Sequence, residues 1–110
     1  MPFSGSPSGS YYPGINVVDF AGSDTYGSGQ PFSSMYSSTV SAVGSSSLPL
    51  SLHETGIIPD PGAMFNNNAA PWILFSTWCD TWLRDNPTAN IQRAYDSPYT
   101  ITRDELPSFD

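Results

Sequence analysis

The chain contains one cysteine and one histidine, the two residue types whose pairing supports thiol nucleophilic catalysis. Cys79 stands between Trp78 and Asp80, and His53 lies far upstream beside Glu54. A cysteine nucleophile needs a base within hydrogen-bond reach and surroundings that stabilise the thiolate. The aromatic and apolar residues around Cys79 instead predict a buried thiol, which is less reactive. We therefore expect Cys79 to be inert and His53 to make a local hydrogen bond.

Metal and phosphate sites need residue sets that this sequence does not offer. A zinc site takes three or four ligands, mostly Cys and His, and the chain has one of each. Calcium sites need carboxylates at alternating positions, whereas Asp104 and Glu105 are adjacent. The segment 27–29 lacks the third glycine of a dinucleotide-binding loop, and there is no lysine for a P-loop. We expect no catalytic, cofactor-binding or metal-binding residue, and no cofactor.

The ten carboxylates could in principle supply the pair that hydrolyses a glycosidic bond. Such a pair lies about 5 to 9.5 Å apart across a groove. No spacing in the sequence pairs two of them, and the chain offers little scaffold to hold a site rigidly. We interpret the carboxylates as solvated surface charges and predict that the chain is not an enzyme.

Trp72, Trp78 and Trp82 form the densest aromatic cluster of the sequence. Tryptophan supplies a large contact area at a low entropy cost and is enriched in interface hot spots. Three interpretations are open: the core of a small helical subdomain, an interface between subunits, or a surface that stacks on sugar rings.

The element expected to position these tryptophans is a helix over residues 71–85. Its apolar residues recur at helical spacing, and Asn86 and Pro87 follow as a stop. A turn is expected at 59–62, a short helical turn at 88–95 and a brief strand at 99–102. We expect four aromatic residues to lie in the 71–85 helix and to be largely buried: Trp72, Phe75, Trp78 and Trp82.

The composition changes near residue 52. Residues 1–52 hold 15 of the 18 serines, seven glycines and five prolines, with Asp19 and Asp24 as the only charges. This pattern predicts a Ser/Gly/Pro-rich extended segment that wraps around neighbouring proteins through spaced aromatic residues. Short strands are expected at 15–20 and 35–43, pairing with each other or with another protein's sheet edge. Residues 53–110 are expected to form a small subdomain that ends in a polar tail.

The fold class expected from these patterns is irregular. Ordering 110 residues costs on the order of 150 kcal/mol, and only 38% of the residues are hydrophobic. We therefore predict a mostly extended or coil chain with short β-strands and one or two short α-helices, a small α+β fold at most, which is not an autonomous globular fold.

The charge balance limits the partners. The net charge is −7, with three arginines and no lysine, which disfavours nucleic acid, phosphate ligands and anionic membranes. The start of the chain has no signal-peptide pattern, and no apolar run is long enough to span a bilayer. A lone cysteine is typical of a reducing compartment, so we predict a location in a virion or an intracellular assembly.

Together these observations predict a non-enzymatic structural subunit of a large multi-copy assembly. A virus or phage virion component, such as a capsid cement, lining or connector protein, fits this composition. It would bind neighbouring protein subunits and no small-molecule substrate. One alternative is a small acidic inhibitor of a basic protein surface, and another is a carbohydrate-binding β module that stacks Trp and Tyr on sugars. The residues expected at the protein interface are aromatic: Tyr11, Tyr12, Phe20, Phe32, Tyr36, Trp72, Phe75, Trp78 and Trp82.

Overall fold

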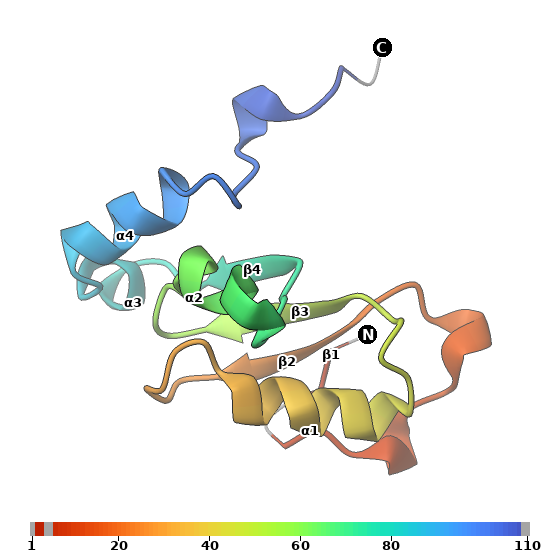
Figure 1. Ribbon diagram of the computed structural model, residues 1–110. Helices are drawn as coiled ribbons and strands as arrows, with labels where there is room; N and C mark the ends of the chain where they lie inside the picture. The colour runs from red at the N-terminus through yellow and green to blue at the C-terminus, as the bar shows by residue number, and fades with distance from the viewer. Residues whose placement is uncertain (1, 4–5, 109–110) are drawn as a thin grey trace.

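Four parallel strands form the centre of the computed structural model, which describes residues 2–3 and 6–108 (Figure 1). The strands lie in the sheet in chain order, β1-β2-β3-β4, and each neighbouring pair is parallel. Because all strands run the same way, their carboxyl ends meet at one edge of the sheet. Their bounds are β1 Pro2–Phe3, β2 Ala21–Thr25, β3 Leu50–Thr55 and β4 Leu74–Thr77.

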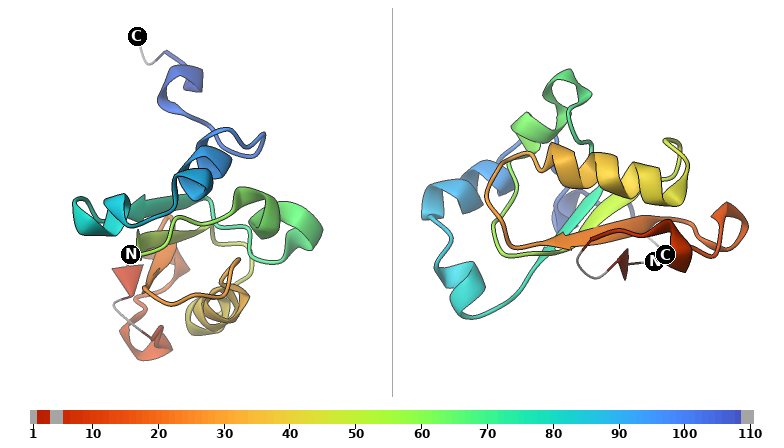
Figure 2. Two further views of the ribbon diagram at one scale, coloured as in Figure 1. Left: turned by 90° about the vertical axis from the view of Figure 1, so that its left-hand side faces the viewer. Right: turned by 90° about the horizontal axis from the view of Figure 1, so that it is seen from below.

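The strands are connected by helices. The helix α1 joins β2 to β3, α2 joins β3 to β4, and α3 and α4 follow β4. Figure 2 shows α1 and α2 on the same side of the sheet. The α-helices are α1 Ser33–Val43, α2 Pro61–Phe65, α3 Thr81–Arg84 and α4 Thr88–Tyr95, and the short 3₁₀ helices are η1 Gly9–Tyr11, η2 Ile15–Val17, η3 Asn66–Asn68 and η4 Arg103–Glu105.

One hydrophobic core lies between the sheet and these helices. Trp72 is its largest side chain, 1% exposed. Its ring meets the ring of Tyr36 edge-on at 4.9 Å, and its Nε1 donates to the carbonyl of Pro31 at 3.2 Å. Both halves of the chain contribute to this core, which contains Phe3, Ala21, Phe32, Val43, Leu48, Leu50, Leu52, Met64, Ala70 and Trp72.

The helix α1 forms within the serine-rich segment. Serines occupy positions 34, 37, 38 and 41, which are all exposed and recur at the period of one helical face. Thr39 and Val43 are buried on the opposite face. Gly44 ends the helix with a φ of 67°, and its N–H donates to the carbonyl of Val40 at 2.9 Å. A left-handed C-terminal residue of this kind favours glycine.

Small residues allow α1 to approach the sheet closely. Ser23 of β2 and Thr39 of α1 are both fully buried. Their hydroxyl oxygens are 2.7 Å apart, and the Thr39 hydroxyl donates to the carbonyl of Met35 at 2.8 Å. The Ser23 hydroxyl therefore donates to Thr39, and this pair fixes the helix against the strand.

The predicted irregular, mostly extended fold is wrong. The chain is a compact α/β domain with a radius of gyration of 14.2 Å. Serine and glycine were interpreted as signs of an extended chain, but in this fold they form the solvent face of a helix and the close contacts between elements. Among the described residues, members of the segment before position 53, from Phe3 to Leu52, pack into one core with Met64, Ala70 and Trp72 of the segment after it.

Several local predictions also differ from the structure. Residues 35–43 lie in α1 rather than in a strand, and 15–17 form η2. In place of one helix over 71–85 there are β4 and α3. Residues 99–102 contain no strand, whereas the helical turn at 88–95 is confirmed as α4. Among the described residues, no helix has the length and apolar character needed to cross a membrane.

Candidate active site

Three polar or aromatic side chains meet at the carboxyl edge of the sheet. Tyr26 directly follows β2, Glu54 is the penultimate residue of β3, and Trp78 directly follows β4. Ligands of parallel α/β sheets bind outside this edge, because the connecting loops there can vary without disturbing the strands.

A hydrogen-bonded chain connects these three residues. The Tyr26 hydroxyl donates to Oε1 of Glu54 at 2.9 Å, and Nε1 of Trp78 donates to the Tyr26 oxygen at 2.7 Å. Since an indole N–H can only donate, the phenolic proton is left for the carboxylate. The pKa of Tyr26 is raised above its usual value, first by desolvation and then by the bond to Glu54, so the phenol keeps its proton near neutral pH.

Glu54 lines a small pocket of about 190 Å³. One side of this pocket is Trp78, whose side chain is half exposed (50%). A carboxylate beside an exposed indole can contact both the hydroxyls and the apolar face of a sugar. The lining residues are His53, Glu54, Ser76, Thr77 and Trp78.

A second aromatic contact supports Tyr26. The rings of Tyr26 and Trp82 lie 5.0 Å apart at an angle of 56°. Both rings pack over Gly56, where an added Cβ would lie 2.9 Å from Cδ1 of Tyr26 and 3.0 Å from Cζ3 of Trp82. Only glycine permits this close approach, so Gly56 fixes the place of the tyrosine that contacts Glu54.

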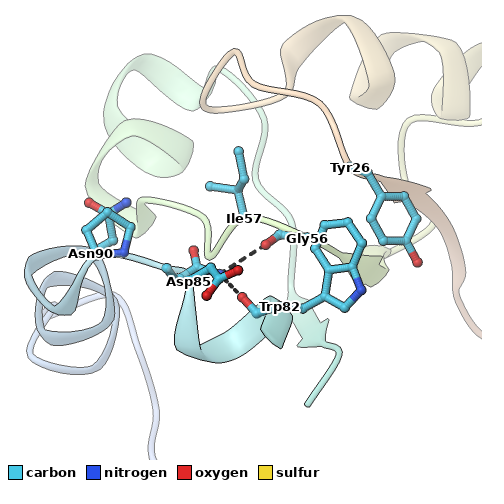
Figure 3. Close-up of a pocket in the computed structure, with 8 residues that line it drawn as sticks. Tyr26, Gly56, Ile57, Trp82, Asp85 and Asn90 are labelled. Atoms are coloured by element: carbon cyan, nitrogen blue, oxygen red, sulfur yellow. Dashed lines mark hydrogen bonds between the residues drawn. The ribbon is translucent and has the colours of Figure 1, made fainter. Parts of the chain in front are cut away.

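Asn86 connects the loop after β3 to α3. It is 7% exposed. Its Nδ2 donates to the carbonyls of Trp82 at 2.7 Å and Gly56 at 3.0 Å, and its Oδ1 accepts from the N–H of Ile58 at 2.9 Å. Figure 3 marks the two bonds from Nδ2. One side chain thus holds together both loops that frame the site.

His53 lies beside Glu54 in sequence and is half-buried. Burial lowers the pKa of its imidazole, against the opposing effect of the negative charges on Asp24 and Glu54. The ring is therefore neutral near neutral pH. Within the described residues, no three His, Cys, Asp or Glu side chains cluster closely enough to hold a metal ion.

The structure separates the nine predicted interface residues into three groups. Phe32 and Trp72 are buried in the core. Three others are partly buried and pack against it: Tyr12, Tyr36 and Phe75. The remaining four are exposed: Tyr11, Phe20, Trp78 and Trp82. The interface role of this set stays a prediction.

Two burial predictions are wrong. Cys79 is exposed, and both Trp78 and Trp82 are about half exposed. The reason is that residues 74–77 form a strand, so residues 78–82 leave the carboxyl edge of the sheet instead of continuing a buried helix.

The sequence interpretation did not single out Glu54 and Tyr26 as functional residues. The available signal was the change from the apolar pattern of residues 50–52 to His53 and Glu54. A carboxylate near the carboxyl end of a buried strand is a candidate for chemistry when the strand belongs to a parallel sheet.

Comparison with known proteins decides the family. The family model described as glycosyl hydrolase family 26 matches residues 5–105, nearly the whole chain. The chain belongs to glycosyl hydrolase family 26. It is 30% identical over 100 residues to the mannan endo-1,4-β-mannosidase of Thermothelomyces thermophilus, covering 87% of this chain and 20% of that protein.

A solved structure supports the same assignment. The crystal structure of the Podospora anserina GH26-CBM35 β-(1,4)-mannanase matches with a TM-score of 0.79 and 29% identity, over 94% of this chain and 24% of that one. The chain therefore spans about a fifth to a quarter of the length of these family 26 relatives.

Family membership corrects the functional predictions. The interpretation as a non-enzymatic virion or assembly subunit is wrong, because the family is one of glycosyl hydrolases. The predicted exclusion of a small-molecule substrate and the expectation of subunit partners fail for the same reason. The acidic inhibitor and the carbohydrate-binding β module are also set aside, since the fold is that of a family 26 α/β domain. The predicted location stays untested.

Proposed function

We propose that this chain forms part of the catalytic centre of a β-1,4-mannan hydrolase, in which Glu54 is one of the two carboxylates that act on the glycosidic bond. The observation that carries this proposal is the hydrogen bond from Tyr26 to Glu54 at the carboxyl edge of a parallel sheet. The substrate class is taken from the names of the two relatives, both mannanases.

Glu54 is assigned the role of the ionised carboxylate that faces the anomeric carbon. A hydroxyl that donates to a carboxylate oxygen stabilises the negative charge on that oxygen. Tyr26 is such a donor, and Trp78 holds it in orientation. A general acid needs the opposite environment, one that keeps the carboxyl protonated. Glu54 is thus suited to attack the sugar or to activate a water molecule.

Trp78 supplies the surface for the sugar ring. The indole borders the same pocket as Glu54, with its side chain half exposed. Pyranose rings carry C–H groups on their faces, and these pack well against an indole. A mannosyl unit on Trp78 would bring its C1 toward the carboxylate.

The second carboxylate is placed opposite this sheet, in a larger catalytic domain. Asp24 pairs with Glu54 in the register of neighbouring strands, so it lies beside Glu54 rather than across the scissile bond from it. Strands that follow each other in chain order, with the connecting helices on one side, belong to singly wound sheets that close into barrels. Closure would bring a carboxylate from another strand to face Glu54.

The test measures the rate of hydrolysis of β-1,4-mannan through the release of reducing ends. Glu54→Gln keeps the size of the side chain and removes its charge, and the rate should fall on the order of a thousandfold or more. Glu105→Gln makes the same chemical change at an exposed residue of η4 and should leave the rate unchanged. An active Glu54→Gln variant would refute the assignment.

A further inference from the structure

The strand β3 carries one residue more than its neighbours at the point where it reaches the site. Against β2, Leu52 pairs with Ser23. The next pair joins Glu54 to Asp24, so His53 is the extra residue. The register against β4 shifts over the same stretch of β3. An extra residue of this kind is a β-bulge, and bulges are frequent beside active sites.

The bulge places His53 beside Glu54 in space as well as in sequence. In a regular strand, neighbouring side chains point to opposite faces of the sheet. Here both side chains line the same pocket, together with residues 76–78 at the end of β4 and just after it. The imidazole is therefore a direct neighbour of the carboxylate that we assign to the reaction.

A glycine of β2 makes room for the imidazole ring. A Cβ added at Gly22 would lie 3.1 Å from Nδ1 of His53, closer than side chains usually pack. Nδ1 is buried and has no hydrogen-bond partner in the described part of the chain. Because burying such an atom costs stability, a histidine at this position is explained better by its effect on the site.

The groups around the ring act on its charge in opposite directions. Desolvation by burial has the largest effect and lowers the pKa of His53. Asp24 of β2, Glu54 of β3 and the backbone of Gly22 favour a proton on the ring, and the amino group at the start of the chain disfavours it. From the side of β4, residues 76–78 border the pocket with uncharged side chains. The ring is thus neutral near neutral pH and takes up a proton in acid.

The charge of this ring matters to the chemistry assigned to Glu54. The transition state of glycoside hydrolysis resembles an oxocarbenium ion, so positive charge develops at the anomeric carbon. A neutral imidazole leaves the negative charge of the carboxylate to face that carbon. A protonated imidazole would pair with the carboxylate and repel the developing positive charge.

We propose that His53 is a positioning residue for Glu54: the uncharged ring, inserted by the bulge, leaves the carboxylate turned toward Tyr26 and the sugar, and the protonated ring pairs with the carboxylate and slows hydrolysis. This inference rests on the proposed function. It gives the reaction an acidic limit that depends on His53 in addition to the protonation of Glu54 itself. Removal of the imidazole should therefore make the rate less sensitive to acid.

The first experiment measures kcat/KM on β-1,4-mannan between about pH 7 and 5, at pH values where tryptophan fluorescence shows the proteins to be folded. Over this range kcat/KM of the unmodified protein should fall about tenfold more than that of His53→Gln, whose amide does not titrate. Ser51→Ala is the matched control, at a buried position of β3 outside the bulge, and should follow the unmodified protein. Parallel profiles for the unmodified protein and His53→Gln would overturn the proposal.

The second experiment needs no substrate. His53 is the only histidine of the sequence, so its imidazole signals in NMR report its titration directly. Glu54→Gln removes a negative charge that favours the proton and should lower the pKa of His53 by about 0.5 or more. Glu105→Gln, at an exposed residue of η4, should leave that pKa unchanged.

The two experiments separate this proposal from the proposed function. An unchanged pKa of His53 in Glu54→Gln would show that the two side chains do not interact, and would overturn the proposal while the proposed function stands. If the unmodified protein hydrolyses no mannan although Glu54→Gln lowers the pKa of His53, the proposed function fails and only the contact between the two side chains stands.

Discussion

The loss of Asn86 should destabilise the fold more than the loss of any surface asparagine. Asn86→Ala removes three hydrogen bonds, at 2.7, 2.9 and 3.0 Å, each worth about 1 kcal/mol. It also leaves the N–H of Ile58 unpaired in a place where that residue is 1% exposed, which adds about 1 kcal/mol or more. The expected loss in the free energy of unfolding is about 3 to 5 kcal/mol.

Urea unfolding followed by tryptophan fluorescence measures this loss. Asn16→Ala makes the same change at an exposed position of η2 and should shift the free energy by less than about 0.5 kcal/mol. A loss below about 1 kcal/mol in Asn86→Ala would mean that the three bonds do not hold the loops together, and the described support of Tyr26 and Trp82 would be wrong.

Three further predictions concern single side chains. Tyr26→Phe removes the donor to Glu54 and the acceptor of Trp78 but keeps the ring on Trp82, so kcat/KM on mannan should fall about 10- to 100-fold; an unchanged rate would contradict the hydrogen bond to Glu54. Thr39→Val leaves the buried Ser23 hydroxyl without its acceptor and should cost about 1 to 3 kcal/mol, and in urea unfolding the double variant with Ser23→Ala should lose less than the sum of the single variants. Burial lowers the pKa of His53 in the folded state, so the unfolded chain binds a proton first as the pH falls below about 6.5, and the free energy of unfolding should fall with it. His53→Gln removes this group, so its free energy of unfolding should fall less between about pH 7 and 5 than that of the unmodified chain. Parallel curves of the free energy of unfolding against pH for the two proteins would contradict the burial of His53.

The helix α1 was predictable from the sequence in part. Tyr36, Val40 and Ala42 alternate with serines over a short stretch, which favours a strand. The exposed serines at 34, 37, 38 and 41 show the helical period over a longer stretch. Such a pattern is easily missed because a helix normally exposes charged residues, and serine itself has only moderate helix propensity.

The strand β4 could not be separated from a helix by spacing alone. Residues 72–75 are all apolar, and a short apolar run fits both a buried strand and one turn of a buried helix. The outcome depends on β3, whose edge β4 joins in parallel. That pairing is between residues far apart in sequence, so no local pattern contains it.

The candidate site depends on the same long-range pairing. Tyr26 and Trp78 directly follow two strands and Glu54 is the penultimate residue of the strand between them, and the three meet only because those strands are parallel neighbours. The sequence shows each residue separately. The tryptophan cluster allows stacking on sugar rings as one alternative, but no spacing in the sequence points to the carboxylate beside it.

The most direct test of the central claim is chemical rescue of Glu54→Ala with azide. The substrate is an aryl β-manno-oligosaccharide, in which the aryl oxide leaves with the electron pair of the C1–O bond as azide forms a C1–N bond. If Glu54 faces the anomeric carbon, its removal opens that face to azide, and turnover should return with an α-configured glycosyl azide as the product. Failure of azide to restore turnover, or a β-configured product, would show that Glu54 does not face the reacting carbon.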